Sequence, residues 1–390
     1  MKPIYLDNAS TTQVDNKVID AMVPYCREKY GNASSLHLMG EEAKRAMEEA
    51  REAIAKEIKA KHKEIILTGS GTEANNFAVK GLFFANYPKK DHIITTKIEH
   101  DCVLNACKWL ESKGARVTYL DVDSQGFVNP KDVERAIISK TFLVSIIHGN
   151  NEIGTIQNIR EIGRICKKHN VLFHTDACQS LTKVPINVKK DNIDLMTLNA
   201  HKIHGPKGVG ALFIKSGKGI RITPLLHGGG QEFKLRSSTE NVPGIVGFGK
   251  AVKIAKKRDV RKMTKLRDYF ISELLRIPNV RLNGPNPLEK ERAKGDRLCN
   301  NINISFGNIE GEAVGSFLNS KGICTSTGSA CSSKSLEPSH VLLALGLNPL
   351  EANSSIRISI SKYTTKQDVD YALNEIKNTV EKLRKISPLT

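Results

Sequence analysis

Three short segments carry groups that could bind one ligand together. LTGSGTEANN runs from an apolar stretch into a helical pattern, so Gly71 and Thr72 would present backbone N–H groups and a hydroxyl at a helix N-terminus. Such a terminus suits a phosphate. Asp176 in HTDACQS follows a strand-like run, where a buried carboxylate needs a cation or N–H donors. Lys202 lies between two histidines in AHKIHGPKG, where a buried amine must be neutral or paired.

Together the three segments predict a ligand with a phosphate, a basic ring nitrogen and an aldehyde that can condense with an amine. Pyridoxal 5′-phosphate (PLP) has all three groups. A nucleotide P-loop is excluded, because the glycine-rich segment lacks the lysine of GxxxxGK[ST]. Taken singly, a Gly-Ser turn before a helix is common and an Asp at a strand end is often only a helix cap. The prediction of PLP therefore depends on the combination.

A fourth segment, TSTGSACSS, surrounds Cys331 with glycine, alanine and hydroxyl residues that cannot pack a core. A cysteine thiolate is a nucleophile. A loop of small residues would leave such a thiol free to move. Without the other segments, a chance cysteine in a Ser/Gly loop would be an equally good interpretation.

The elements that must position these residues alternate along the chain. Amphipathic stretches separate short apolar runs at residues 64–69, 92–96, 117–122, 142–148, 171–177, 194–200 and 210–215. This alternation predicts βαβ units and a mostly parallel sheet, with ligand chemistry at the carboxyl ends of the strands. After about residue 260 the pattern changes to a smaller α+β arrangement. We predict a large domain over residues 13–260 and a small domain over residues 1–12 and 261–390.

The composition is that of an ordinary folded protein, with 39% hydrophobic and 26% charged residues in a chain of 390. No run of about 18 apolar residues occurs, and the start MKPIYLDNASTT lacks an apolar signal region. We therefore expect no export, no membrane contact and a cytoplasmic location. The eight cysteines show no CxxC pair or zinc spacing, so we expect reduced thiols and no metal site of the protein's own.

The net charge of +18, from 59 Lys and Arg against 41 Asp and Glu, is enough to attract polyanions. The basic runs AKEIKAKHKE and KIAKKRDVRKMTK are mixed with acids at helical spacing and lack interleaved aromatic residues. Solvated helix faces explain such runs better than a nucleic-acid surface does. We expect no stable nucleic-acid binding.

Ten motifs in order closely resemble the cysteine desulfurases of the NifS/IscS group. They are DNASTT, GSGTEANN, IEHD, HGNNEIGTIQ, HTDACQS, AHKIHGPKG, HGGGQE with RSSTEN, GSACSS, EPSHVLLALGL and SSIRIS. These enzymes are fold-type I PLP enzymes of the class V aminotransferase-like family. The resemblance covers nearly all of the chain and implies a seven-stranded, mostly parallel sheet flanked by helices in the large domain.

For the cofactor ring, the resemblance implies four roles. Lys202 would bind PLP covalently, and Asp176 would pair with the protonated pyridine nitrogen. His100 of IEHD would stack on the ring and take part in catalysis. Gln179 would hydrogen-bond to the ring oxygen.

For the phosphate, the resemblance implies Gly71 and Thr72 together with the segment around His201. Thr239 of RSSTEN would reach the phosphate of the neighbouring subunit in a homodimer. Where the family usually has Ser before x-His-Lys, this chain has Asn199, whose amide can donate to a phosphate but takes more space. Cys178 stands where the family often has Thr or Val, and we interpret it as a small buried thiol without a role.

For the substrate, the resemblance implies L-cysteine. Asn151 would lie beside the cofactor and the substrate, and Arg357 would bind the substrate carboxylate with its bidentate fork. Cys331 would attack the substrate sulfur, giving L-alanine and a persulfide. The sulfur would pass to an iron–sulfur scaffold protein, with which Cys331 could share a [2Fe–2S] cluster, and to other acceptors such as tRNA-thiolation enzymes.

Two alternatives remain open on the sequence. A selenocysteine lyase would share every PLP residue, and comparing release of sulfur and of selenium would separate the two activities. A nonenzymatic, basic RNA-binding or sulfur-scaffold protein on a decayed enzyme fold is the alternative of a different class. The presence of Lys202, Asp176 and Cys331 argues against it, and a yellow purified protein would oppose it further.

Overall fold

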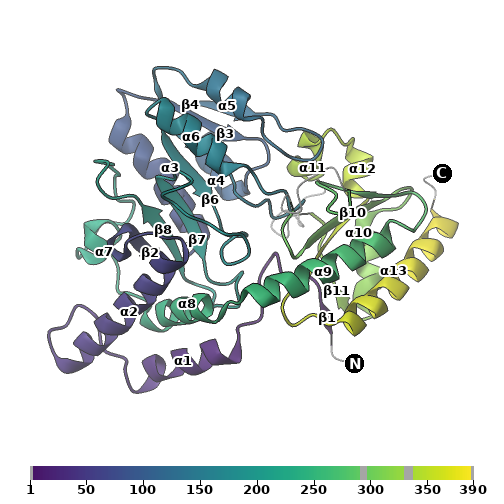
Figure 1. Ribbon diagram of the computed structural model, residues 1–390, viewed down its shortest axis with the longest axis horizontal. Coiled ribbons are helices and arrows are strands. Elements are labelled where there is room, and N and C mark those ends of the chain that lie inside the picture. Colours follow the sequence, from purple (N-terminus) through teal and green to yellow (C-terminus); the bar gives the residue numbers. More distant parts are fainter. Residues whose placement is uncertain (1–2, 290–296, 329–336, 388–390) are drawn as a thin grey trace.

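The computed structural model describes residues 3–289, 297–328 and 337–387. Its larger unit is built on a seven-stranded sheet (Figure 1). The strands lie side by side in the order β2 (Ile65–Thr68), β8 (Gly210–Ile214), β7 (Leu195–Asn199), β6 (Leu172–Asp176), β5 (Thr141–Ser145), β3 (His92–Thr96) and β4 (Arg116–Leu120). β8 runs antiparallel to both neighbours, and the other adjacent pairs are parallel. The predicted mostly parallel sheet is confirmed.

Helices cover both faces of this sheet, so its strands other than the edge strand β4 are buried along most of their length. In β2, Ile65 and Leu67 pack into the core on one face and Ile66 into the core on the other, because successive strand residues point in opposite directions. One face is covered by α2 (Leu38–Glu57), α5 (Pro130–Ala136), α6 (Ile159–Lys168) and α8 (Val242–Ile254). The other face is covered by α3 (Gly71–Asn86) and α4 (Asp101–Glu111).

Two further helices complete the larger unit. Helix α1 (Asn16–Arg27) packs beside α8, and the short α7 (Gln231–Lys234) lies against β2. A 3-10 turn (His62–Glu64) leads from α2 into β2. Within α7, Glu232 and Phe233 have left-handed backbone angles, with φ of 48° and 60°. The buried Arg51 fixes this segment, since its guanidinium forms two hydrogen bonds of 2.6 and 2.7 Å with the Glu232 carboxylate.

The smaller unit has its own sheet and core. Strands β12 (Ser355–Ser359), β10 (Asn301–Phe306) and β9 (Val280–Leu282) form an antiparallel sheet. Helices α9 (Lys257–Leu274), α10 (Gly311–Ser320) and α13 (Lys366–Ile386) pack on it through a separate apolar core. Two short helices, α11 (His340–Ala344) and α12 (Pro349–Asn353), precede β12 in sequence.

The N-terminal segment joins the smaller unit. Strand β1 (Ile4–Tyr5) pairs in parallel with β11 (Ile323–Cys324), and Leu6 belongs to the core of the smaller unit. The two units meet along a long seam, which Figure 1 shows between the large sheet and β10. The boundaries at residues 12/13 and 260/261 stay a prediction.

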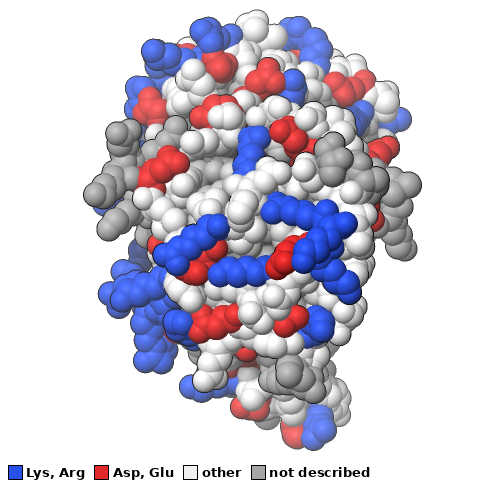
Figure 2. Space-filling view, turned by 90° about the vertical axis from the view of Figure 1, so that its right-hand side faces the viewer, with Lys and Arg blue, Asp and Glu red and all other residues white. Residues whose placement is uncertain are grey.

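Charged side chains are mixed on the surface of the smaller unit. In Figure 2, Lys and Arg side chains gather near the middle of the face and lie next to Asp and Glu side chains. Charged pairs of the helices of the smaller unit include Lys377 with Glu273 at 3.5 Å and Lys385 with Glu381 at 2.8 Å. The described helices include none that is both long enough and apolar enough to cross a membrane.

Candidate active site

A cavity of about 230 Å³ lies at the carboxyl ends of the parallel strands. The ends of β6 and β7 and the N-termini of α3 and α4 all face it, as expected at this edge of a doubly wound sheet. It is lined by Ala9, Ser10, Ser70, Gly71, Thr72, Asn75, His100, Cys102, Asn151, Asp176, Cys178, Asn199, His201, Lys202 and Arg357. Most of the residues predicted from the sequence therefore lie around one space.

The N-terminus of α3 forms the anion-binding end of the cavity. Ser70 caps the helix, and its Oγ accepts the N–H of Glu73 at 3.0 Å. A Cβ on Gly71 would lie only 2.7 Å from Sγ of Cys178, so no larger residue fits there without movement. The arrangement leaves the first N–H groups of a 16-residue helix beside the space, and these suit a phosphate.

Asp176 ends β6 and is 5% exposed. Its Oδ2 accepts a hydrogen bond from Nδ2 of Asn75 at 2.7 Å, and its Oδ1 accepts one from the N–H of Cys178 at 2.9 Å. Among the described residues no cation pairs with this carboxylate. A buried carboxylate held by N–H donors alone is expensive unless a cationic group approaches it, and a protonated ring nitrogen is such a group.

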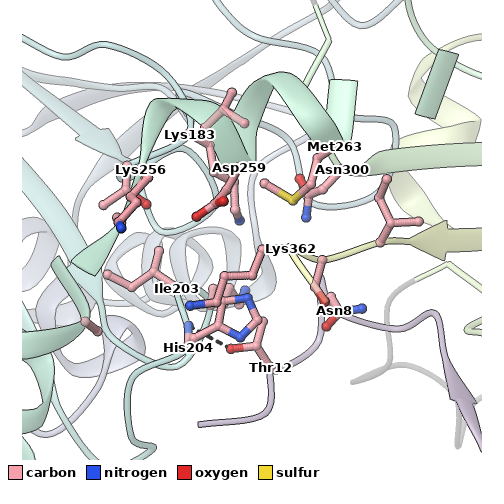
Figure 3. A pocket seen from close by; sticks show the side chains of 17 residues that line it. Asn8, Thr12, Lys183, Ile203, His204, Lys256, Asp259, Met263, Asn300 and Lys362 are labelled. Carbon is pink, nitrogen blue, oxygen red and sulfur yellow. Dashed lines mark hydrogen bonds between the residues drawn. The ribbon is translucent and has the colours of Figure 1, made fainter. Parts of the chain in front are cut away.

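Lys202 follows β7 and lines two cavities at once. It contributes to the active-site cavity and to a second one of about 50 Å³ at the seam between the two units. Figure 3 shows side chains of both units around this second cavity, among them Lys183 and His204 from the larger unit and Asn300 and Lys362 from the smaller. The amine of Lys202 forms no ion pair with a described residue, so it is available for a bound aldehyde.

His100 caps α4 at the rim of the cavity. Its Nδ1 accepts the backbone N–H of Cys102 at 3.1 Å. Burial and the nearby Lys202 lower the pKa of His100, which favours a neutral ring that can lie flat against another ring. His201, also in the lining, has its pKa lowered to about 4, chiefly by burial and then by Lys202.

Arg357 comes from β12 of the smaller unit and is 2% exposed. Its Nη2 donates to Oδ1 of Asp7 at 2.9 Å and to Oγ of Ser10 at 2.6 Å, and its Nη1 donates to the backbone oxygen of Asn151 at 3.3 Å. Its Nε has no partner among the described residues. The guanidinium is thus held in place by these hydrogen bonds, and Arg357 lines the cavity, where a substrate carboxylate could meet it.

Two predicted residues are not part of this cavity lining, and a third is not among the residues that the structure describes. Gln179 is 3% exposed and donates from Nε2 to the oxygen of Ala9 at 2.8 Å, while its Oε1 has no partner among the described residues. Thr239 is exposed on the surface beyond the lining. Cys331 lies outside the described residues.

The sequence predicted Ser70 as part of the phosphate-binding turn, but it did not point to four other lining residues, Ala9, Ser10, Asn75 and Cys102. Ala9 and Ser10 belong to the DNASTT motif and Asn75 to GTEANN, so the motifs marked them without showing what they contact. Cys178 was expected to be a small buried thiol. It is 6% exposed and burial raises its pKa.

The residues present fit PLP. A phosphate would meet the N-terminus of α3, a protonated ring nitrogen would meet Asp176, an aldehyde would meet Lys202, and a substrate carboxylate would meet Arg357. All four partners line the same cavity, so each polar group of the cofactor and the substrate has a protein group to bind it.

Comparison with known proteins agrees with this chemistry. Residues 4–372 match the family model described as aminotransferase class-V. The "Cysteine desulfurase IscS" of Dictyoglomus turgidum is 50% identical over 392 aligned residues, which cover 99% of this chain and 97% of that protein.

Two solved structures extend the likeness to the fold. One, titled "NIFS-LIKE PROTEIN", superposes with a TM-score of 0.89 at 40% identity and covers 98% of this chain and 100% of its own. Another, titled "SspA in complex with cysteine", has a TM-score of 0.82 at 38% identity and covers 93% and 100%.

The chain belongs to the class V aminotransferase family of PLP-dependent enzymes. Within that family it is a cysteine desulfurase of the NifS/IscS group.

Proposed function

We propose that the cavity binds PLP and L-cysteine and that the sulfur is transferred to Cys331, giving L-alanine and a persulfide. The observation that carries the proposal is the convergence of Lys202, Asp176 and Arg357 with the N-terminus of α3 on one space. The solved relative whose title names a complex with cysteine supports the substrate. When bound, PLP supplies an aldehyde that captures the substrate amine and a ring that accepts electrons from the Cα atom.

The residues around the PLP ring would each have a separate role. Lys202 would hold the cofactor and later move the proton at Cα of the substrate. Asp176 would keep the ring nitrogen protonated, and the neutral imidazole of His100 would lie on the ring. Gly71, Thr72 and the amide of Asn199 would bind the phosphate together with the segment around His201. Gln179 would donate to the ring oxygen from the second hydrogen of its Nε2, since the first is donated to the oxygen of Ala9.

Arg357 and Asn151 would orient the substrate by its carboxylate, with the Cβ–S bond toward the attacking thiol. Cys331 would act as a thiolate, forming an S–S bond to the substrate sulfur while the Cβ–S bond breaks. The carbon skeleton would leave as L-alanine after protonation. The persulfide would then pass its outer sulfur to acceptors, an iron–sulfur scaffold among them.

The enzyme would work as a homodimer in the cytoplasm, with Thr239 serving the partner subunit. Two observations support a dimer. Thr239 is exposed and lies away from the cavity of its own chain. Large apolar side chains are exposed on α1, in the segment after it and at the first residue of α2, namely Ile19, Val23, Tyr30, Leu36 and Leu38, and exposed apolar side chains that gather in one region are typical of an interface.

The test is a single-turnover reaction of the purified, PLP-loaded protein with L-cysteine. We expect one alanine and one persulfide per active site, with the persulfide mapped by mass spectrometry to Cys331. Alanine without a persulfide on Cys331 would contradict the transfer step. A parallel reaction with selenocysteine tests the lyase alternative, sedimentation tests the dimer, and persulfide labelling with pull-down identifies the acceptors.

A further inference from the structure

A chain of polar contacts links Asp176 to His100 across the floor of the cavity. Nδ2 of Asn75 donates to Oδ2 of Asp176 at 2.7 Å, and the same nitrogen donates to Sγ of Cys102 at 3.1 Å. Sγ of Cys102 lies 3.1 Å from Nδ1 of His100. The chain joins the end of β6 to the N-terminus of α4 through a side chain of α3.

Asn75 is the central member of the chain and is 1% exposed. An amide nitrogen has two hydrogens, and the two contacts use one each. Its Oδ1 has no partner among the described residues. The amide is nevertheless fixed in this orientation, because turning it over would bring Oδ1 against the carboxylate of Asp176 in a buried place, where repulsion is strong.

Cys102 connects Asn75 to His100 as a neutral thiol. Burial, and next the charge of Asp176, raises its pKa to about 12, so the S–H proton stays on sulfur at neutral pH. Sulfur accepts from Asn75, and its proton can point to Nδ1 of His100. The backbone N–H of Cys102 also points to Nδ1 at 3.1 Å, so Nδ1 is the acceptor nitrogen and the proton of the neutral ring is on Nε2.

We propose that Asn75 is a positioning residue of the cofactor site, which orients the Asp176 carboxylate directly and the His100 imidazole by way of the Cys102 thiol. The proposal rests on the proposed function, since it takes Asp176 and His100 as the partners of the PLP ring. In this role Asn75 acts through Asp176 and Cys102 rather than on the ring or the substrate. It sets the two groups before the cofactor arrives, which reduces the reorganisation that binding would otherwise require.

The first test compares two neighbouring asparagines of α3. Asn75→Ala removes the donor to Asp176, whereas Asn76→Ala removes only a hydrogen bond to the oxygen of Thr72 in the same helix. Titration of the apoprotein with PLP should show affinity about 10- to 100-fold weaker for Asn75→Ala, the loss typical of a hydrogen bond to a charged group. Asn76→Ala should bind PLP as the wild type does.

Asn75→Asp separates lost hydrogen bonds from lost packing. The side chain keeps its size, loses both N–H donors and places a second carboxylate beside Asp176. PLP affinity should fall at least as far as in Asn75→Ala. Wild-type affinity in Asn75→Asp would overturn the proposal, since the amide donors would then contribute nothing.

A spectroscopic measurement distinguishes positioning from general support of the fold. The nitrogen chemical shift of PLP labelled with ¹⁵N in the ring reports whether that nitrogen is protonated. In Asn75→Ala the shift should move toward the value found in Asp176→Asn, and in Asn76→Ala it should not move. An unchanged shift in Asn75→Ala would overturn the proposal, even if the variant binds PLP weakly.

Double variants test whether Asn75 acts through Asp176 and Cys102. In an Asp176→Asn background, Asn75→Ala should weaken PLP binding much less than in the wild type, because the contact to a charged carboxylate is already lost. Cys102→Ala should have a smaller effect than Asn75→Ala and should not add to it fully. Independent, multiplicative losses in all pairs would overturn the proposal while leaving the proposed function intact. Failure of the wild-type protein to bind PLP or form alanine would instead contradict the proposed function.

Discussion

Ser326 and Arg357 exchange two backbone hydrogen bonds. The N–H of Arg357 donates to the oxygen of Ser326 at 2.6 Å, and the N–H of Ser326 donates to the oxygen of Arg357 at 3.1 Å. The residue proposed to bind the substrate carboxylate is therefore fixed to the chain that leads into the GSACSS motif. On the far side of the motif, Oγ of Ser339 donates to Oε2 of the buried Glu152 at 2.6 Å. Glu152 is next to Asn151, so both chain ends that flank the motif are attached beside the cavity.

Arg357→Ala should raise the KM for L-cysteine about 10- to 100-fold, the loss expected for a charge-assisted pair with the substrate carboxylate. Steady-state kinetics of the PLP-loaded enzyme measure it. Arg281→Ala is the matched control, since Arg281 is an exposed arginine of the same small sheet. An unchanged KM in Arg357→Ala would rule the role out.

Cys331→Ala and Cys331→Ser should both bind PLP normally but form no persulfide, and their rate of alanine formation should collapse. The serine hydroxyl cannot replace the thiol any more than the alanine methyl group can, because it is not ionised near neutral pH and does not bind sulfane sulfur. Cys26→Ala, which removes an exposed thiol elsewhere, should behave as the wild type. Sulfide release from cysteine at the normal rate by Cys331→Ala would show that the transfer step is wrong.

Lys202 should carry the pyridoxyl group after borohydride reduction of the PLP-loaded protein and peptide mapping. Lys202→Ala should lose turnover completely, because no other described lysine lines the active-site cavity. Lys207→Ala, a change at an exposed lysine of the same motif, should keep both label and activity. A label on another lysine of the wild type would refute the assignment.

His174 makes the apoprotein sensitive to acid. Burial lowers its pKa from an ordinary 6.5 to about 4, and both ring nitrogens face buried hydroxyls, Ser145 at 2.8 Å and Thr197 at 3.0 Å. Between these two pH values the unfolded chain binds more protons than the folded one, so the free energy of unfolding falls as the pH drops.

In denaturant titrations, His174→Gln should lower stability at pH 7 but reduce its dependence on pH between 6.5 and 4. The exposed His62 provides the control, since His62→Gln should leave that dependence as it is. If the free energy of unfolding depends equally on pH in His174→Gln and in the wild type, His174 is not the cause of the acid sensitivity.

The larger sheet and the strand-end residues could be predicted because their signals are local. Continuous apolar runs mark strands buried on both faces, and Asp176 and Lys202 follow such runs directly. Arg357 could be placed in the last strand of the smaller unit for the same reason. Each of these predictions needed only the residues that are close in sequence to the predicted strand or side chain.

The remaining parts of the site depend on contacts that local patterns do not encode. Strands β1 and β11 are two residues each, too short for any periodicity to identify. Asn75 reads as an ordinary polar residue of an amphipathic helix, and its contacts with Asp176 and Cys102 arise only when α3, β6 and α4 have packed. The likeness to the family could not supply Cys102 either, because no motif assigned it a role.

The pairing of β1 with β11 has a consequence for how the protein matures on the ribosome. Residues 4–12 are synthesised long before their partners at Ile323, Cys324 and Ser359. The large sheet can form while this segment still waits, since domains fold as units during synthesis. Ala9 and Ser10 line the active-site cavity, so the cavity is completed only after Ser359 has left the exit tunnel. We therefore expect that a nascent chain stalled before β12 does not retain PLP.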